Sequence, residues 1–432
     1  MRQVKYLVVL CAIIFVGCRE YSHKNKADKI SGSPSINQKI ADLTVKQQLA
    51  KSHYHFVESA RIQLEINYFT EVNELNDDAM RDELERKYEL LRSIFIEEQA
   101  NLKHPPKRFQ KKFDYEQKDV PFRGPDFTSV YHPKVLAEVN RIFKEYGALY
   151  VGETDPEKHG GFKGYKAYRP WAGYWYPFSD TSIYTLLEKY EQVLEKSGIK
   201  ADIVKKEREM FEGFSTANWE GRCDALAIAG ILTKEPIEPL TINGITFGIE
   251  EQKGLKVYAY MNYPVAKYGI SYEGNAATDG TFQDVKPEAF HKMATIYLKA
   301  NRPFVVDTVA GVQKWNRSLF SLRVKITKDP IVKNAFLVRA YPTFVKERRE
   351  KREDVTNTDD YMGLIYDYRL YYDPNTKNAD GHYKVIAGQW LGDSFESHPD
   401  SFLVPYSNKQ PSSTNQIFNN HMDFFKTKFL QY

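Results

Sequence analysis

The stretch NWEGRCDALAIAGIL, residues 218–232, changes character at its cysteine. The residues before Cys223 suit a loop, whereas the small and aliphatic residues after it predict a buried helix. Cys223 would then lie in the first helical turn, where free backbone amides and the positive end of the helix dipole stabilise a thiolate. This placement favours a nucleophile over a buried, inert core cysteine, and both interpretations stay open at this point.

A nucleophilic cysteine needs a histidine base and an Asp or Asn that orients it. Downstream, His291 opens a predicted strand at residues 291–298, and Asp307 lies within a second predicted strand at residues 302–308. Two antiparallel strands joined by a short turn would bring these side chains together. An imidazolium beside the thiol would lower its pKa from about 8.5 to about 4. We therefore predict Cys223, His291 and Asp307 as the catalytic residues.

Elsewhere in the chain, the sequence pattern predicts mainly helices before residue 240 and mainly strands after it. Its 432 residues suggest two or three domains. Apolar stripes predict two amphipathic helices within residues 40–102 and a capped helix at 182–196, and prolines mark a linker at 104–125. Short strands are predicted at 241–248, 254–261, 303–309, 336–341, 363–372 and 383–390. The order indicates an α+β fold with an N-terminal helical region.

The amino terminus predicts an exported lipoprotein. Arg2 and Lys5 precede an apolar run at residues 6–16, which is too short to span a bilayer. The run ends in Phe15-Val-Gly-Cys18, which resembles a bacterial lipobox, so we expect lipidation of Cys18. Residues 1–17 are then a signal peptide, residues 18–38 a flexible tether, and the location a bacterial cell envelope. An ordinary secretory signal is the alternative.

Composition excludes several classes of protein. The 42% of hydrophobic residues and 27% of charged residues are typical of a folded globule. A net charge of +4 is too small to favour nucleic acid as a partner. Of three cysteines, Cys11 would leave with the signal peptide and Cys18 would carry lipid, so no internal disulfide is expected.

Other motifs give weaker signals. The segment Asp373–Gly381 has oxygen ligands at calcium-like spacing, but it lies between predicted strands and lacks a terminal Glu, so a hairpin loop is favoured. We therefore predict neither a metal site nor a cofactor. His398 is predicted as structural. The aromatic segment 169–177 could line a substrate cleft or cover the core.

The order of several motifs resembles the transglutaminase elicitor family. These motifs are Trp219-x-Gly-x-Cys223, Glu235-Pro236, Ile242-Asn-Gly-Ile-Thr-Phe247, the His291 segment, Asp307 with Trp315-Asn316, and His398-Pro-Asp-Ser-Phe402 with Pro405. The resemblance covers residues 127–405 and implies a papain-like, transglutaminase-like core with the triad Cys223, His291 and Asp307. It departs from the family pattern at Asp224 and at Arg317-Ser318. Taken together with the helical and linker patterns above, we predict a helical region and linker at 39–125, a transglutaminase-like catalytic core at 126–325, and a β-rich part of the same enzyme at 326–432.

The resemblance implies acyl transfer from a protein glutamine carboxamide to a primary amine through a thioester on Cys223. The oxyanion donors are expected to be the Cys223 backbone amide and either Trp219 or Asn218. Partners would be protein or peptide substrates, together with a membrane through Cys18. Two alternatives remain: a Cys-His-Asp hydrolase, which would be a peptidase, amidase or deamidase, and a non-catalytic binding lipoprotein.

Overall fold

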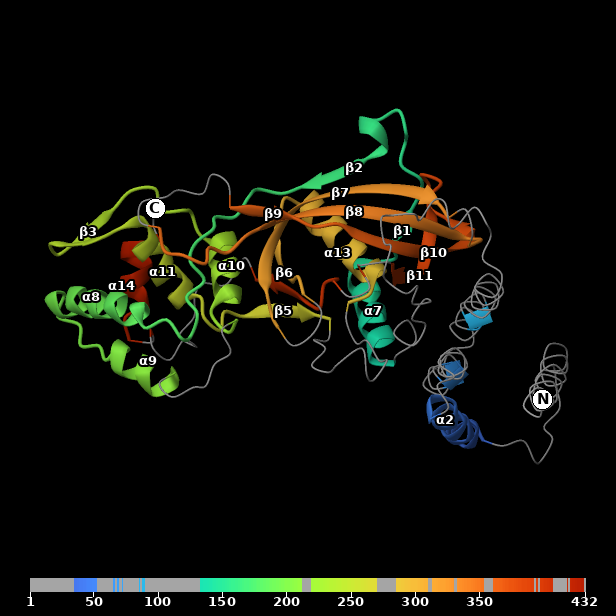
Figure 1. Cartoon of the computed structure of the whole chain (residues 1–432), viewed down its shortest axis with the longest axis horizontal. Helices are drawn as coiled ribbons and strands as arrows, with labels where there is room; N and C mark the ends of the chain where they lie inside the picture. The colour runs from blue at the N-terminus through green and yellow to red at the C-terminus, as the bar shows by residue number, and fades with distance from the viewer. Residues whose placement is uncertain are drawn as a thin grey trace, which may run out of the picture.

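The computed structural model of the chain combines a large antiparallel sheet with helices on both of its faces (Figure 1). The described residues are 35–52, 65–66, 68–69, 72, 85, 88–89, 133–211, 219–269, 285–309, 313–329, 332–352, 360–391, 394, 397–406, 418 and 420–430. The predicted signal peptide, tether and most of the predicted helical pair at 40–102 lie outside these residues. Within that pair, α2 (Ile36–Ser52) is helical.

The helices that surround the sheet are amphipathic or fully buried. They are α7 (Pro133–Tyr146), α8 (Ser182–Lys196), α9 (Ile203–Phe211), α10 (Cys223–Leu232), α11 (Ile249–Ala259), α13 (Pro287–Lys299) and α14 (Met422–Phe429), with a short 3-10 turn at His159–Gly161. The bounds of α8 match the predicted helix at 182–196, because its buried stripe of Ile183, Leu186, Leu187 and Tyr190 is plain in the sequence.

The strands form one ten-stranded sheet and one hairpin within the described residues. The strands of the sheet are β1 (Tyr150–Val151), β2 (Lys163–Lys166), β5 (Val265–Tyr268), β6 (Phe304–Asp307), β7 (Asn316–Lys328), β8 (Ala335–Val345), β9 (Tyr361–Gly363), β10 (Tyr366–Lys377), β11 (Tyr383–Trp390) and β12 (Phe402–Pro405). Their order is β1-β11-β10-β8-β7-β6-β12-β5, with β2 paired to β7 and β9 to β8. The expected mixture of helices and antiparallel strands is therefore present.

Two predicted strands differ from the structure. The predicted strand at 241–248 is the hairpin β3 (Leu240–Ile242) and β4 (Ile245–Phe247), because Asn243 and Gly244 adopt positive φ and turn the chain. The predicted strand at 254–261 lies largely in α11, where helical periodicity is hidden because nearly every side chain is buried.

Strand β6 separates two hydrophobic cores, and it lies between α10 and α13 in Figure 1. Phe304 and Val306 pack in the α13-side core, which also contains Phe290, Met293, Tyr368 and Trp390. Val305 packs in the α10-side core, which also contains Leu187, Leu226, Ile228 and Tyr258. Since side chains alternate along a strand, Asp307 faces the same side as Val305, toward α10.

Candidate active site

The loop before α10 fixes where its first residue lies. Gly221 forms a bridge to Pro177, and a Cβ at this position would lie 2.8 Å from the Trp175 ring and 2.9 Å from the Pro177 Cα. Only glycine permits this close approach. Arg222, which is 2% exposed, donates to the Tyr176 carbonyl at 3.1 Å and pairs with Glu207. The loop and the aromatic segment 169–177 therefore hold the start of α10 together.

Polar groups from β7 and the residues before it surround the Cys223 sulfur. The thiol donates to the Lys314 carbonyl at 3.6 Å, and the Asn316 amide Nδ2 donates to Sγ at 3.7 Å. Cys223 is 5% exposed, and the rings of Trp175 and Trp315 lie close together with centroids 5.3 Å apart. The sulfur is thus buried, but its neighbours are hydrogen-bonding groups as well as aliphatic side chains.

Asp307 lies on the strand beside Asn316, as its direct cross-strand partner between β6 and β7. The carboxylate accepts a hydrogen bond from the Trp315 backbone N–H at 2.9 Å. Burial raises the pKa of Asp307 to about 6, while the Trp315 and Val309 amides and the charges of Lys314 and Arg317 oppose this shift. The carboxyl group therefore titrates just below neutral pH.

The thiol itself is protonated at neutral pH. The pKa of Cys223 is raised to about 12, mainly by burial and also by the charges of Asp224 and Asp307, while hydrogen bonds with Asn316 oppose the shift. This corrects the predicted thiolate with a pKa near 4. The physical reason is that desolvation and two carboxylates outweigh the first turn of the helix, and no described histidine hydrogen-bonds to the sulfur.

His291 does not lie beside Cys223 or Asp307. The predicted strand at 291–298 is helix α13, which begins at Pro287 and packs in the α13-side core. His291 Nδ1 is 2.7 Å from the Tyr368 hydroxyl, and burial lowers the pKa of His291 to about 3, assisted by the charges of Lys163 and Lys299. Of the predicted triad, Cys223 and Asp307 therefore lie on the α10 side of β6. His291 lies on α13, on the other side of this strand.

A buried ion pair supports the polar end of β6 and β7. Arg317 donates to both Glu347 carboxylate oxygens, at 2.7 and 2.8 Å, and also contacts the Thr308 hydroxyl. The Thr308 N–H and hydroxyl both donate to the Trp315 carbonyl at 3.1 Å. These contacts fix the backbone on either side of Asp307 and Asn316.

The remaining predicted residues have separate places. Trp219 is partly buried and packs against the α10-side core, whereas Asn218 and Cys18 lie outside the described residues. His398 Nδ1 donates to the Ser394 carbonyl at 2.9 Å, and the ring stacks on Trp390 in a packed environment. In the Asp373–Gly381 segment, strand β10 continues to Lys377 and a turn leads into β11.

Asn316 is the site residue that spacing arguments missed. It was visible only as part of the Trp315-Asn316 motif. Its place directly opposite Asp307 would have followed from the register of the β6–β7 hairpin, since Phe304 pairs with Leu319. Within the described residues, no cluster of three or more His, Cys, Asp or Glu side chains could hold a metal ion. No described helix is long and apolar enough to cross a bilayer.

Comparison with known proteins gives two matches. The family model described as transglutaminase elicitor matches residues 194–350. Among solved structures, the chain is similar to the crystal structure of the GP42 transglutaminase from Phytophthora sojae, with 19% identity and a TM-score of 0.46, covering 65% of this chain and 91% of that chain. No curated protein matches the sequence. The resemblance to the transglutaminase elicitor family is therefore confirmed, over a segment that contains Cys223, His291 and Asp307.

Proposed function

We propose that the protein is a transglutaminase-like acyltransferase in which Cys223 forms a thioester with a protein glutamine carboxamide and passes the acyl group to a primary amine. The observation that carries this proposal is the polar contact between Asn316 and the Cys223 sulfur at the start of α10, beside the cross-strand partner Asp307. A cysteine with only a packing role would not need hydrogen-bonding groups from another element.

In the proposed reaction, the Cys223 sulfur attacks the carboxamide carbon, and the bond from that carbon to nitrogen breaks. The thiol proton leaves with the departing ammonia. Asp307 is the proposed proton acceptor on this route, because its carboxyl is ionised at neutral pH and its charge already acts on the thiol. The amine then attacks the thioester carbon, the bond from that carbon to sulfur breaks, and a proton from the amine nitrogen passes through Asp307 to the sulfur as the isopeptide bond forms.

Asn316 and the Cys223 backbone N–H are the proposed stabilisers of the reacting atoms. The Asn316 amide holds the sulfur in place before attack. The backbone N–H at the first residue of α10 is one of the helix amides without a partner inside the helix, so it is available to an oxyanion. The family resemblance supports a papain-like core for this arrangement, with the cysteine helix packed on the sheet.

We further propose that the chain is anchored to a bacterial envelope membrane by lipid on Cys18. The basic residues, the short apolar run and the cysteine that ends it support this location. Metabolic labelling with a radioactive fatty acid tests it. Label in the wild type and none in Cys18→Ala is expected, and label retained by Cys18→Ala would contradict the proposal.

The acyltransferase proposal is tested by incubating the protein with a labelled primary amine and a glutamine-rich protein as the acyl donor. We expect incorporation by the wild type, none by Cys223→Ala, and strongly reduced incorporation by Asp307→Asn and Asn316→Ala. His291→Gln is the matched control and should retain incorporation. Equal label with wild type and Cys223→Ala would refute the proposal. Ammonia release without incorporation would instead support a hydrolase with the same nucleophile.

A further inference from the structure

A cavity of about 440 Å³ lies at the end of α10 that is farthest from Cys223. Tyr168, Arg169 and Trp171 line one side of it, and residues 230–235 line the other. Its volume falls within the range of about 300–1,000 Å³ that is typical of small-molecule sites. Since α10 has ten residues and a helix rises about 1.5 Å per residue, the cavity is roughly 10–15 Å from the cysteine. It is therefore separate from the candidate active site.

The two walls of the cavity are fixed against each other by direct contacts. The Tyr168 hydroxyl donates to the Ile231 carbonyl at 2.7 Å, and Trp171 Nε1 donates to the Thr233 carbonyl at 3.0 Å. The Trp171 carbonyl also approaches α10 at Gly230, where a Cβ would lie 2.7 Å from the carbonyl oxygen. A side chain at position 230 would push the walls apart. The cavity is thus preformed, so a ligand would not have to order its walls.

The ring of Tyr168 is held in place but is open to solvent. The residue lines the cavity and is 44% exposed. Its backbone N–H donates to Asn301 Oδ1 at 2.8 Å, and its hydroxyl is bonded to Ile231. Because the ring is already fixed, a ligand that packs on it costs little side-chain entropy. Tyr168 therefore offers a flat apolar surface that suits the C–H face of another ring.

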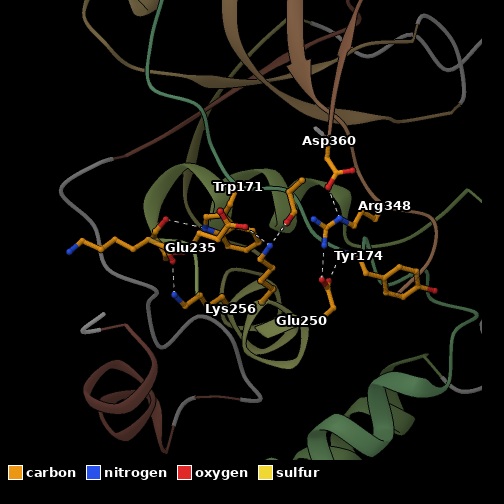
Figure 2. Close-up of polar contacts among 11 residues, drawn as sticks. Trp171, Tyr174, Glu235, Glu250, Lys256, Arg348 and Asp360 are labelled. Carbon is orange, nitrogen blue, oxygen red and sulfur yellow. Dashed lines mark hydrogen bonds and ion pairs between the residues drawn. The ribbon is translucent and has the colours of Figure 1, made fainter. Parts of the chain in front are cut away.

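The charged groups around the cavity are of both signs. Arg169 and Lys234 are exposed cations in the lining, whereas Glu235 and the C-terminal end of α10 contribute negative charge. The Glu235 carboxylate pairs with the buried Lys253 ammonium at 2.6 Å (Figure 2). An ionic ligand of either sign would therefore meet a group of its own sign in the lining. The arrangement favours a ligand without net charge.

Hydrogen-bonding groups of both kinds line the same space. The Arg169 guanidinium and the Lys234 ammonium are donors, and the Glu235 carboxylate is an acceptor that can take several hydrogen bonds at once. A hydroxyl group both donates and accepts. A ligand that carries several hydroxyl groups would consequently match this mixture of donors and acceptors.

We propose that this cavity binds the ring of a neutral saccharide, with its C–H face on Tyr168 and its hydroxyl groups bonded to Arg169, Lys234 and Glu235. A sugar ring combines the features that the lining requires: a flat apolar face, hydroxyl groups around its edge and no net charge. The saccharide is either a free sugar or the end of a longer glycan. Binding is independent of the proposed reaction at Cys223, which lies at the other end of α10.

Saturation-transfer difference NMR on the full wild-type chain tests binding directly. The probes are the methyl glycosides of glucose, galactose, mannose and N-acetylglucosamine, together with a trisaccharide of each sugar. We expect at least one sugar to bind, with the strongest saturation on the ring protons of one face. Equal affinity of its methyl glycoside and trisaccharide indicates a free sugar as the ligand, and tighter binding of the trisaccharide indicates a glycan. No binding of any of these neutral probes would overturn the proposal.

Charged analogues test the requirement for neutrality. Methyl glucuronide adds a carboxylate to the sugar ring, and methyl glucosaminide adds an ammonium. We expect neither to bind more tightly than the best neutral probe. Raising the salt concentration from about 50 to about 500 mM should change the affinity of that neutral probe by less than about twofold, because no ion pair is formed with it. Tenfold tighter binding of either charged analogue than of every neutral probe would overturn the proposal.

The matched variants are Tyr168→Ala and Tyr361→Ala. Tyr168→Ala should weaken saccharide binding at least tenfold, because the sugar loses the ring on which it packs. Tyr361 is 51% exposed on β9 and is not part of the cavity lining, so its variant should bind as wild type does. Unchanged affinity in Tyr168→Ala would contradict the proposal. If this variant fails to fold, Arg169→Gln gives a second comparison, with an expected loss of at least threefold.

Cys223→Ala separates this site from the candidate active site. Saccharide binding should be unchanged in this variant, whatever the outcome of the amine-incorporation assay. Saturation transfer that persists in Cys223→Ala and is lost in Tyr168→Ala supports the cavity as the site. Saturation transfer that is lost in Cys223→Ala and persists in Tyr168→Ala would place the sugar at the sulfur and contradict the proposal.

Discussion

The two sides of β6 each bury one group able to act in acid–base or nucleophilic chemistry, and their surroundings differ. On the α10 side, Cys223 meets Asn316, the Lys314 carbonyl and the field of Asp307. On the α13 side, His291 meets the Tyr368 hydroxyl in an aromatic core. The α10 side thus gives the Cys223 sulfur several polar neighbours. The α13 side gives His291 one hydrogen bond, between its Nδ1 and the Tyr368 hydroxyl.

The difference teaches that strand alternation decides which residues share a site. Asp307 follows Val305 by two positions and therefore faces α10, whereas Phe304 and Val306 face α13. His291, on α13, instead contacts Tyr368 of β10. Separation of only 16 residues along the chain consequently does not bring His291 to Asp307.

The largest expected effect is on catalysis. Cys223→Ala should abolish amine incorporation, a loss of at least about 1,000-fold, because the thioester cannot form. Asn316→Ala should reduce the rate by roughly 10- to 100-fold through the loss of one positioned donor. Steady-state incorporation of a labelled amine measures both. A variant lacking Cys223 that retained the wild-type rate would show that the α10 side is not the reactive side.

His291→Leu tests the opposite side of the strand. It should leave the Tyr368 hydroxyl without its partner and lower the free energy of unfolding by roughly 1–3 kcal/mol. Activity per folded molecule should stay within about twofold of wild type, since His291 does not contact the sulfur. Chemical denaturation and amine incorporation measure the two effects. The control is Tyr368→Phe combined with His291→Leu, which removes both polar groups and should recover part of the lost stability.

Stability should depend on pH in opposite directions for the two sides. The pKa of Asp307 is raised to about 6, so the folded state binds more protons and stability falls as pH rises from about 4 to about 6. The pKa of His291 is lowered to about 3, so stability is full above about 6.5 and falls as pH decreases.

Urea denaturation across pH 3–8 separates these contributions. Asp307→Asn should remove a fall of roughly 2–3 kcal/mol between pH 4 and 6, which corresponds to a pKa shift of about two units. His291→Leu should reduce the fall below pH 6.5. If Asp307→Asn leaves the profile between pH 4 and 6 unchanged, the carboxyl is not held in the buried environment described above.

The smallest expected effect concerns the reactivity of the thiol. The charge of Asp224 is the second cause of the raised pKa of Cys223, after burial, so Asp224→Asn should lower this pKa. Iodoacetamide should then alkylate Cys223 several times faster at pH 8, whereas wild type reacts slowly. Lys205→Gln provides a surface control. A slower reaction in Asp224→Asn would contradict the assigned electrostatics.

Parts of this arrangement were accessible from the sequence. The break in composition at Cys223 predicts the start of α10, and the apolar stripe from Ile183 predicts α8. The run from Phe304 to Val306 predicts β6 as a buried strand, because such runs are typical of strands covered on both faces. The local pattern of apolar residues was sufficient for these elements, because it is either a continuous apolar run, as in α10 and β6, or a stripe at helical spacing, as in α8.

The position of His291 was not predicted correctly, although a signal was present. Pro287 is typical of a first helical turn, and Phe290, Met293, Ala294 and Tyr297 recur at helical spacing, so residues 287–299 satisfy the pattern of a helix better than that of a strand. The partners of the sulfur were harder to predict. Asn316 reaches Cys223 through a contact between residues 93 apart, which depends on tertiary packing.

The most direct test of the central claim is to trap the acyl-enzyme. The protein is mixed with a glutamine-containing dipeptide without amine, quenched in acid, digested, and analysed by mass spectrometry. We predict the dipeptide acyl group on the peptide that contains Cys223, in wild type and in His291→Gln but not in Cys223→Ser. An adduct on another residue, or wild-type transfer activity without any adduct on Cys223, would contradict the account.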